Sequence, residues 1–370
     1  MVTVRDVARR AGVSTSTVSH VLNETRFVSD DLRERVMTAM RELDFQPNAA
    51  ARMLSLKRSN TIGLIVSDIR NPFFSSITRG VEDVAQENGY TVVLCNSDEN
   101  MLRETACLKA LQSRQVDGVL LASAGAADEF AARLVHAGFP MVLVDRDLPD
   151  VDVPAVLLNN EGAAYSAVRH LIERGHRRIG MLSGRDSIST TIERVAGYER
   201  AIREAGIEPD GRLVISGEST SEGAEAATHA MLQIQPPPTA IFSGNNLMSI
   251  GALHTISSQG LNVPDDVALV GFDDFPFPWS DAFRPHLTTI AQPTYELGRR
   301  SAETLVQMLK QTVPHPPRRI VLDGKLVIRE SSDSIPATPK PTPLVEVSRR
   351  DRASRANRPI RRARSVPPLE

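Results

Sequence analysis

Hydrophobic positions in the first part of the chain recur at the three- and four-residue spacing of short amphipathic helices. Thr3 to Asp6 matches a helix capping box, and Gly12 ends the apolar pattern that follows it. Ser14 is placed to cap a second helix, whose apolar stripe runs from Val18 to Leu22. A third periodic segment begins at Ser29-Asp30-Asp31 and ends before Pro47. The pattern therefore predicts three short helices.

From Thr61 onward the pattern changes to short continuous apolar runs, which are typical of strands buried on both faces. These runs lie at 62–66, 91–94, 118–121, 141–144, 155–158, 179–182, 240–242 and 267–270. Helical stretches such as 77–88 and 165–174 separate most of them. Such alternation predicts an α/β region that contains two doubly wound parallel sheets.

Composition places few limits on this picture. The chain has 370 residues, 41% of them hydrophobic, and no run of apolar residues long enough to span a membrane. It begins without the charged and apolar segments of a secretion signal. Cys95 and Cys107 have neither a disulfide pattern nor the spacing of metal ligands. We therefore expect a cytoplasmic protein.

The net charge of −2 conceals an uneven distribution. Residues 1–58 hold 10 Lys and Arg against 7 Asp and Glu, and residues 333–370 hold 9 against 4. The segment between them is correspondingly acidic, with a net charge of −10. Positive charge is thus concentrated at the two ends of the chain, where contacts to nucleic-acid phosphates would use it.

The run from Val7 to Ser19 has the side chains that two closely crossing helices need. Ala8 is small enough for a close crossing, and Gly12 tolerates the positive φ of a tight turn. The second helix then presents side chains suited to base edges in the major groove and to nearby phosphates. These are Thr15, Ser16, Ser19 and His20. The run predicts a DNA-binding helix-turn-helix.

The segment from Val2 to Leu56 closely resembles the lactose/galactose-repressor family. The matching motifs are Arg5-Asp6-Val7-Ala8, Ala11-Gly12-Val13-Ser14, Thr17-Val18-Ser19 and Pro47-Asn48-Ala49-Ala50-Ala51-Arg52. His20 and the run Thr25–Val28 resemble the ribose- and purine-repressor branch of that family. The resemblance extends to about residue 330, and it implies an all-α helix-turn-helix headpiece followed by a two-lobed α/β core like that of periplasmic binding proteins.

The expected domain boundaries follow from this resemblance. Residues 1–46 would form the DNA-binding domain, 47–58 a hinge helix or linker, and 59–332 the ligand-binding and dimerisation core. Within the core, the N-lobe would comprise about 61–160 plus 291–320, and the C-lobe about 161–290 plus 321–330. Residues 333–370 are rich in Pro, Ser and Arg and are expected to form a disordered basic tail.

The resemblance also implies which residues contact the operator. Paired hinges would enter the minor groove, where Leu54 would wedge a central base step. Arg52, Ser55 and Lys57 make the surroundings of Leu54 too polar for a core helix. The implied DNA contacts are Thr3, Ser14, Thr15, Ser16, Thr17, Ser19, His20, Asn23, Arg26, Asn48, Ala51, Arg52, Leu54 and Lys57.

Several polar and aromatic groups directly follow predicted strands, where ligands of open α/β sheets bind. Each taken singly has an ordinary explanation as a core residue, a solvated pair or a helix cap. Together they supply aromatic faces for a ring and planar groups for bidentate bonds to adjacent hydroxyls. Matched by position to ribose-type binding proteins, the implied ligand contacts are Asn71, Phe73, Phe74, Asp145, Arg146, Arg194, Asn245, Asp273 and Gln292.

Two positions bear on the identity of the effector. The purine-binding branch has an Arg near the position of Ile188, and an isoleucine cannot bond a purine. Family members usually have an aromatic residue where Ser219 stands, which leaves one face of the pocket open unless Phe277 or Trp279 fills it. We therefore expect a small sugar of the ribose or aldose type, with a purine or a sugar phosphate as the alternative.

The chain lacks the Walker loop, the G-x-G-x-x-G fingerprint and the G-x-S-x-G elbow, so we expect no enzyme, no catalytic residue, no metal site and no cofactor. A sugar-binding protein without a regulatory role would lack residues 1–57 and would carry a secretion signal. Because each headpiece contacts half of a palindrome, a homodimer on double-stranded operator DNA is expected. Repression is the family default, and the sequence leaves open whether the effector releases or tightens operator binding.

Overall fold

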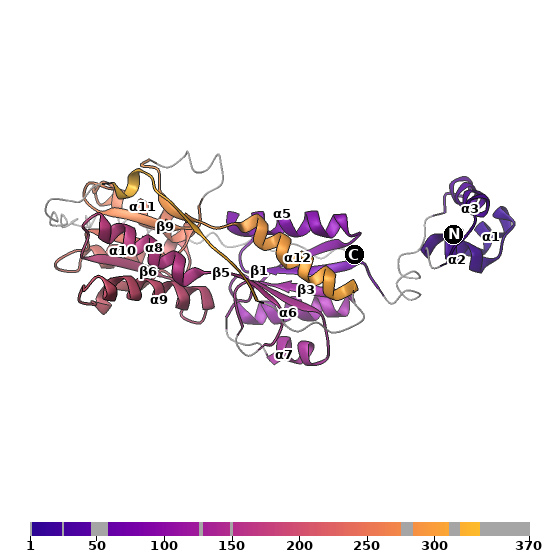
Figure 1. Ribbon diagram of the computed structural model, residues 1–370, viewed down its shortest axis with the longest axis horizontal. Helices are drawn as coiled ribbons and strands as arrows, with labels where there is room; N and C mark the ends of the chain where they lie inside the picture. The colour runs from indigo at the N-terminus through magenta and orange to yellow at the C-terminus, as the bar shows by residue number, and fades with distance from the viewer. Residues whose placement is uncertain are drawn as a thin grey trace, which may run out of the picture. The chain divides into compact units, whose positions relative to one another are not determined.

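The computed structural model describes residues 2–23, 26–45, 58–125, 129–148, 151–274, 284–310 and 319–333 (Figure 1). The chain divides into two compact units. The first unit comprises Met1–Asn159, Ser187–Thr190 and Gln292–Gly324, and the second comprises Asn160–Asp186, Thr191–Ala291 and Lys325–Glu370. Of the hinge expected at 47–58 and the tail expected at 333–370, residues 47–57 and 334–370 lie outside the described residues.

Residues 2–45 form a helical headpiece with its own small core. Its helices are α1 (Val4–Ala11), α2 (Thr15–Asn23) and α3 (Asp30–Glu42). The predicted capping box is present, since the Thr3 amide donates to the Asp6 carboxylate at 3.0 Å and the Thr3 hydroxyl accepts from the Asp6 amide. Gly12 ends α1 with a φ of +65°. The third helix ends at Glu42, several residues before the predicted boundary at Pro47, which lies outside the described residues.

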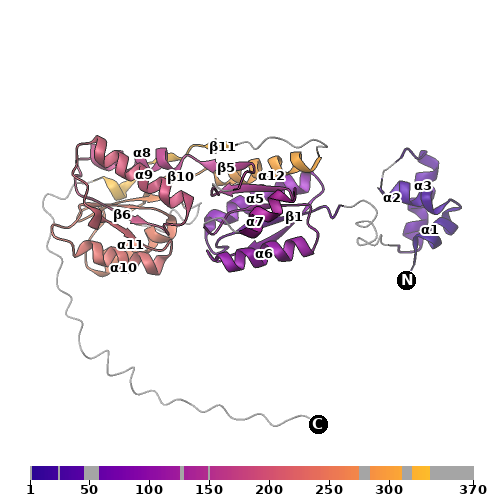
Figure 2. The same cartoon turned by 90° about the horizontal axis from the view of Figure 1, so that it is seen from below.

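A six-stranded parallel sheet forms the centre of the first α/β unit. Its strands are β1 (Thr61–Val66), β2 (Thr91–Asn96), β3 (Gly118–Leu121), β4 (Met141–Asp145), β5 (Ala155–Leu158) and β11 (Arg319–Leu322). They lie in the order β11-β5-β4-β3-β1-β2. Four helices flank this sheet: α5 (Pro72–Glu87), α6 (Met101–Ser113), α7 (Glu129–His136) and α12 (Thr294–Lys310) (Figure 2).

Both faces of this sheet are buried. Ile62 and Leu64 pack with side chains of α5 and α12, whereas Ile65 packs with side chains of α6 and α7. The backbones of α5 and α12 approach closely, because a Cβ added at Gly80 would lie 2.3 Å from the Tyr295 carbonyl oxygen. These two faces explain why the strands are continuous apolar runs.

The second unit repeats this architecture. Its strands are β6 (Ile179–Ser183), β7 (Val214–Ser216), β8 (Ala240–Ser243), β9 (Ala268–Phe272), β10 (Thr288–Ala291) and β12 (Lys325–Val327), in the order β12-β10-β9-β8-β6-β7. The flanking helices are α8 (Asn160–Glu173), α9 (Ser189–Glu204), α10 (Ser221–Leu232) and α11 (Asn246–Ser258), with short 3-10 helices at Gly211–Leu213 and Glu330–Ser332. Strand β12 pairs antiparallel with β10, whereas the other pairs are parallel.

The predicted fold class is confirmed, with one refinement and some omissions. All eight predicted apolar runs are strands, and several extend one or two residues further at their carboxyl ends. The antiparallel β12 makes the second sheet mixed rather than purely parallel. Strands β7, β10, β11 and β12 were not predicted. Of these, β7 and β12 have only three residues each, and β11 alternates between exposed and half-buried positions.

Among the helices of the described ranges, none is both long enough and apolar enough to cross a membrane.

Candidate functional site

The amino-terminal end of α2 is rich in hydroxyl groups. The Ser14 hydroxyl accepts from the Thr17 amide at 3.0 Å, so Ser14 caps the helix as predicted. It also lies 2.8 Å from the hydroxyls of Ser16 and of Thr17. Thr15 and Ser16 are exposed, whereas Ser19 is half-buried. Exposed donors at a helix amino terminus are well suited to phosphates and base edges.

The other predicted DNA contacts have varied placements. Thr3 is exposed and engaged in the capping box, His20 is half-buried, and Arg26 is exposed. Asn23 ends α2, but its side chain lies outside the described residues, as does all of the predicted hinge set. That set is Asn48, Ala51, Arg52, Leu54 and Lys57.

The headpiece also uses an arginine that the sequence patterns did not single out. Arg35 of α3 donates from Nη2 to the Ala11 carbonyl at 2.8 Å, and to the Gly12 carbonyl at 3.2 Å. It thereby satisfies carbonyl groups at the carboxyl end of α1, which otherwise have no partner in the helix. Arg35 thus fixes α3 against the turn that leads into α2.

Two buried aspartates mark equivalent places in the two α/β units. Asp145 is the last residue of β4, and Asp273 directly follows β9. Their φ angles are +68° and +69°, in the left-handed region that costs energy for a residue with a side chain. Such strained residues cluster at functional sites. Both aspartates were predicted ligand contacts, and the structure places each at the carboxyl end of a buried strand.

Arg146 follows Asp145 and forms a two-pronged ion pair with Glu99. Its Nη1 and Nη2 donate to the two carboxylate oxygens of Glu99 at 2.7 and 2.6 Å. Nη1 also donates to the Ser123 carbonyl at 2.8 Å, and Nε lies 3.7 Å from an oxygen of Asp145. Burial lowers the pKa of Arg146, but the carboxylates of Glu99, Asp145 and Glu104 together outweigh it, and the pKa is raised above its ordinary value. Arg146 is therefore charged in the site.

A second buried carboxylate holds the end of β3 beside this pair. Glu104 of α6 accepts from the Ala124 amide at 2.5 Å and from the Ser123 hydroxyl at 3.2 Å. Sequence patterns indicated neither Glu99 nor Glu104 as a site residue. The available signal for Glu99 was its place in the polar run Asp98-Glu99-Asn100, a few residues after the predicted strand at 91–94.

The predicted aromatic contacts lie in the first turn of α5. Asn71 is the N-cap of this helix and accepts from the Phe73 amide at 3.0 Å, and Pro72 begins the helix. The rings of Phe73 and Phe74 meet edge to face with centroids 4.9 Å apart. Both rings are buried in the core cluster shared with β1. Gln292 is half-buried between β10 and α12.

Arg194 lies on α9 and is held on three sides. Nε donates to Asn160 at 2.9 Å, Nη1 donates to the Gly244 carbonyl at 2.7 Å, and the guanidinium lies 3.7 Å from the centroid of the Phe272 ring. Asn160 is a further site residue that the patterns did not reveal, since it begins a helix like many capping asparagines. The arrangement presents a fixed planar cation within the second unit.

Asn245 and Ser219 meet in the second unit. Asn245 caps α11, because its side-chain oxygen accepts from the Met248 amide at 2.7 Å, and its Nδ2 donates to the Ser219 carbonyl at 3.1 Å. Phe277 and Trp279, which were expected to compensate for Ser219, lie outside the described residues. Within the described ranges, His, Cys, Asp and Glu residues form no group of three or more that could hold a metal ion.

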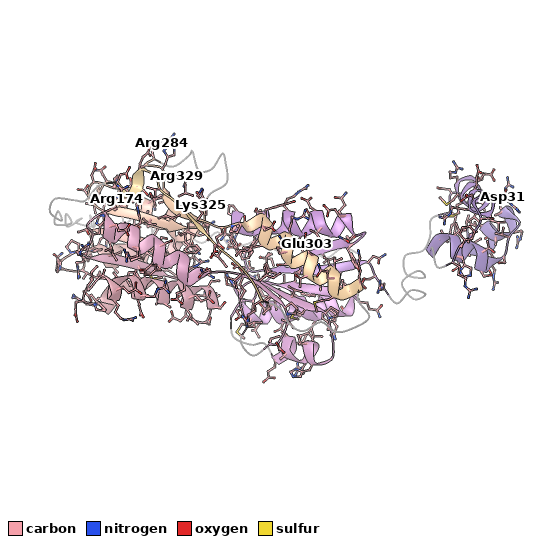
Figure 3. The ribbon with its side chains drawn as sticks, viewed as in Figure 1. Asp31, Arg174, Arg284, Glu303, Lys325 and Arg329 are labelled. Atoms are coloured by element: carbon pink, nitrogen blue, oxygen red, sulfur yellow. The ribbon has the colours of Figure 1, made fainter. Side chains whose placement is uncertain are left out.

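The residue after Asp273 forms an ion pair of its own. Arg329, which follows β12 (Figure 3), donates to both carboxylate oxygens of Asp274, at 3.0 and 2.7 Å. It also donates to the Leu287 carbonyl at 2.7 Å. Asp274 is thus fixed to the segment that completes the second sheet.

A headpiece with an exposed, hydroxyl-rich second helix, in one chain with two α/β units that bury polar groups at their strand ends, defines a ligand-responsive DNA-binding regulator. Residues 3–48 match the model of bacterial regulatory proteins of the lacI family. Residues 59–326 match the model of periplasmic binding proteins and the sugar binding domain of the LacI family. The chain belongs to the LacI family of transcription regulators.

Known relatives are similar in sequence to this chain over nearly their whole length. The chain is 36% identical to the HTH-type transcriptional repressor PurR of Photobacterium profundum, covering 90% of this chain and 98% of the relative. It is 36% identical to the ribose operon repressor of Haemophilus influenzae, covering 90% and 100%. These relatives are repressors rather than enzymes.

Two solved structures are similar over the same span. The complex of the transcriptional regulator CelR with cellobiose is 34% identical, with a TM-score of 0.69 and coverage of 90% of this chain and 100% of that one. The lac repressor dimer bound to operator and the anti-inducer ONPF is 29% identical, with a TM-score of 0.78 and coverage of 90% and 99%. These comparisons confirm the predicted family, fold class and regulatory function.

Proposed function

We propose that this chain is a repressor that binds a palindromic operator as a homodimer, and that a small sugar of the ribose or aldose type changes its operator affinity. The observation that carries the effector class is the pair of buried aspartates, Asp145 and Asp273, at equivalent strand ends. Carboxylates accept hydrogen bonds from adjacent hydroxyls, which a sugar offers in pairs. Arg146 directly follows Asp145, and Arg194 lies over the ring of Phe272, the residue before Asp273, so each aspartate has a fixed planar cation near it in the chain or in space.

The environment of Ile188 supports a sugar over a purine. This side chain is 2% exposed and apolar, and it stands near the position where the purine-binding branch has an Arg. A relative is a ribose operon repressor, and a similar solved structure holds cellobiose. The purine remains the second candidate, since the headpiece resembles the branch that ribose and purine repressors share.

Titration calorimetry against D-ribose, D-glucose, cellobiose, adenine and hypoxanthine tests the effector class. Sugar binding without purine binding is expected, and purine binding without sugar binding would contradict the proposal. Asp145→Asn should weaken sugar binding by about tenfold or more, because the buried acceptor loses its charge. Asp152→Asn is the matched control, since Asp152 is exposed and the same charge is removed.

For DNA binding we propose the contacts implied by the family. Thr15 and Ser16 of α2 would contact the major groove, and Leu54 would act as the minor-groove wedge. A two-fold dimer suits a palindromic site, and the solved lac repressor is a dimer on its operator. Leu54→Ala should weaken operator binding and leave sugar binding unchanged, and an unchanged operator affinity would remove the wedge role.

Footprinting of the full chain on DNA upstream of its own gene, with and without the sugar that calorimetry identifies, tests the regulatory part. A symmetric protected site is expected. The change in protection caused by the sugar shows whether it is an inducer or a corepressor. An asymmetric half-site would contradict the homodimer.

A further inference from the structure

The donor fork of Arg146 is already occupied in this structure. Both of its terminal nitrogens bond to Glu99, and one of them bonds to the Ser123 carbonyl as well. The Arg146 and Glu99 side chains are only 10% and 14% exposed. An arginine fork is the group that recognises carboxylates and phosphates most specifically, and here a carboxylate of the same chain takes that place.

Three carboxylates lie close to this arginine. Glu99, Glu104 and Asp145 supply three carboxylates against the one guanidinium of Arg146. Glu104 and Asp145 are buried, so solvent screens them weakly. These four described residues therefore carry a formal net charge of −2, which opposes the approach of an anion.

The backbone holds Glu99 in place. Asp98 and Glu99 have φ angles of +51° and +54°, so two consecutive residues adopt the left-handed conformation. The Glu99 amide donates to the Ser67 carbonyl at 3.0 Å, and Asn100 then caps α6. Surroundings that fix a costly backbone conformation are typical of functional sites.

We infer that Glu99 determines the effector class of this site: by occupying the Arg146 fork, its carboxylate excludes anionic sugars and leaves a site for neutral polyols. The inference rests on the proposed function, because it takes the strand ends of the first unit as a sugar site. Neutral hydroxyls can donate to the Asp145 carboxylate, whereas a phosphate or a carboxylate can only accept and would have to displace Glu99.

The second unit contains the same turn with a different residue. Glu218 and Ser219 follow β7 just as Asp98 and Glu99 follow β2, and their φ angles are +52° and +60°. At the place of Glu99 stands Ser219, whose carbonyl accepts from Asn245. The turn is therefore compatible with an uncharged side chain at this position. The backbone conformation does not require the glutamate of the first unit, so its charge is the property that distinguishes it from Ser219.

The test compares neutral sugars with their phosphate esters on the full chain. The ligands are D-ribose, D-ribose 5-phosphate, D-glucose and D-glucose 6-phosphate, each titrated by calorimetry. Wild type should bind the neutral sugar at least about tenfold more tightly than its ester, and Glu99→Gln should shift that ratio by about tenfold or more towards the ester. Glu99→Ser, which copies the second unit, should shift it in the same direction.

Asp98→Asn is the matched control. It removes the same charge from the adjacent residue of the same turn, but Asp98 is exposed and its partners are Asn96 and Arg103 rather than Arg146. Its ratio should stay within about threefold of wild type. Thermal unfolding of each variant shows whether it is folded, and the serine variant decides the question if the glutamine variant does not fold.

The outcomes separate this inference from the proposed function. A ratio for folded Glu99 variants within about threefold of wild type overturns the inference, as does a wild type that prefers the esters. A wild type that binds neither neutral sugar overturns the proposed function. In that case the phosphate esters alone test the inference. It predicts that the Glu99 variants bind the esters at least about tenfold more tightly than wild type does.

Discussion

The two α/β units have the same strand order but reverse the charges at the end of the fourth strand. In the first unit Arg146 follows the strained aspartate and pairs with Glu99, whereas in the second unit Asp274 follows it and pairs with Arg329. The strained φ is the same in both, +68° and +69°. The comparison teaches that the backbone conformation of this strand end does not depend on the sign of the charge that follows it.

The two ion pairs also differ in their exposure to solvent. The side chains of Arg146 and Glu99 are 10% and 14% exposed, whereas those of Arg329 and Asp274 are each 25% exposed. Removing one partner from a buried pair leaves an uncompensated charge, and the cost rises with burial. The two units should therefore respond unequally to the same type of substitution.

The largest expected effect is the loss of stability when the arginine of either ion pair, Arg146–Glu99 or Arg329–Asp274, is replaced. Arg146→Met should lower the free energy of unfolding by about 3–5 kcal/mol, because Glu99 stays buried without its partner. Arg329→Met should cost less, about 1–2 kcal/mol, since water can reach Asp274. Urea denaturation of the full chain measures both, and equal losses would contradict the difference between the units.

The helix crossings provide a second comparison. A Cβ at Gly298 of α12 would lie 2.1 Å from the Ile77 carbonyl oxygen, and a Cβ at Gly197 of α9 would lie 2.3 Å from the Glu161 carbonyl oxygen. Alanine at either glycine should destabilise the chain by about 1–3 kcal/mol, because backbone must move. Gly211→Ala is the control, since its Cβ would meet none of the described atoms within 4 Å. Thermal unfolding that distinguishes neither glycine from the control would refute the close crossings.

A smaller effect concerns Arg194, the cation of the second unit. Lysine keeps the charge but loses the planar fork that bonds Asn160 and Gly244, and it loses the stack on Phe272. Arg194→Lys should weaken sugar binding by about tenfold and leave operator binding without sugar unchanged. Calorimetry and a DNA-binding titration check the two halves, and unaltered sugar binding would remove Arg194 from the site.

The smallest effect is a pH dependence that differs between the units. Burial raises the pKa of Cys107 in the first unit to about 11 and that of Tyr198 in the second to about 12. The ordinary values are 9.0 and 10.0, so each group contributes its full stabilisation below its ordinary pKa and loses it as pH rises from that value through the raised pKa of the folded state. Melting temperatures should fall from about pH 9 upward. In a plot of melting temperature against pH, Cys107→Ala should remove the part of the fall that begins near pH 9, and Tyr198→Phe the part that begins near pH 10. Identical curves for the two variants would contradict this order.

Sequence patterns predicted the strands that are buried on both faces, because such strands need continuous apolar runs. They also predicted that Asp145 and Asp273 lie at strand ends, since Asp145 directly follows the run 141–144 and Asp273 lies three residues after the run 267–270. They did not predict the partner of Arg146. That pairing depends on two consecutive left-handed residues, Asp98 and Glu99, and neither of them is the glycine that would indicate such a turn.

The strand order of the first unit has a consequence for synthesis on the ribosome. Strand β5 pairs with β11, which is made about 160 residues later, after nearly all of the second unit. At about 5–20 residues per second, β5 therefore waits roughly 8–30 s as an unpaired sheet edge. An edge of buried aliphatic residues is a template for wrong pairing, so the nascent chain is most exposed to aggregation in that interval. A chaperone that covers this edge should raise the yield of native protein.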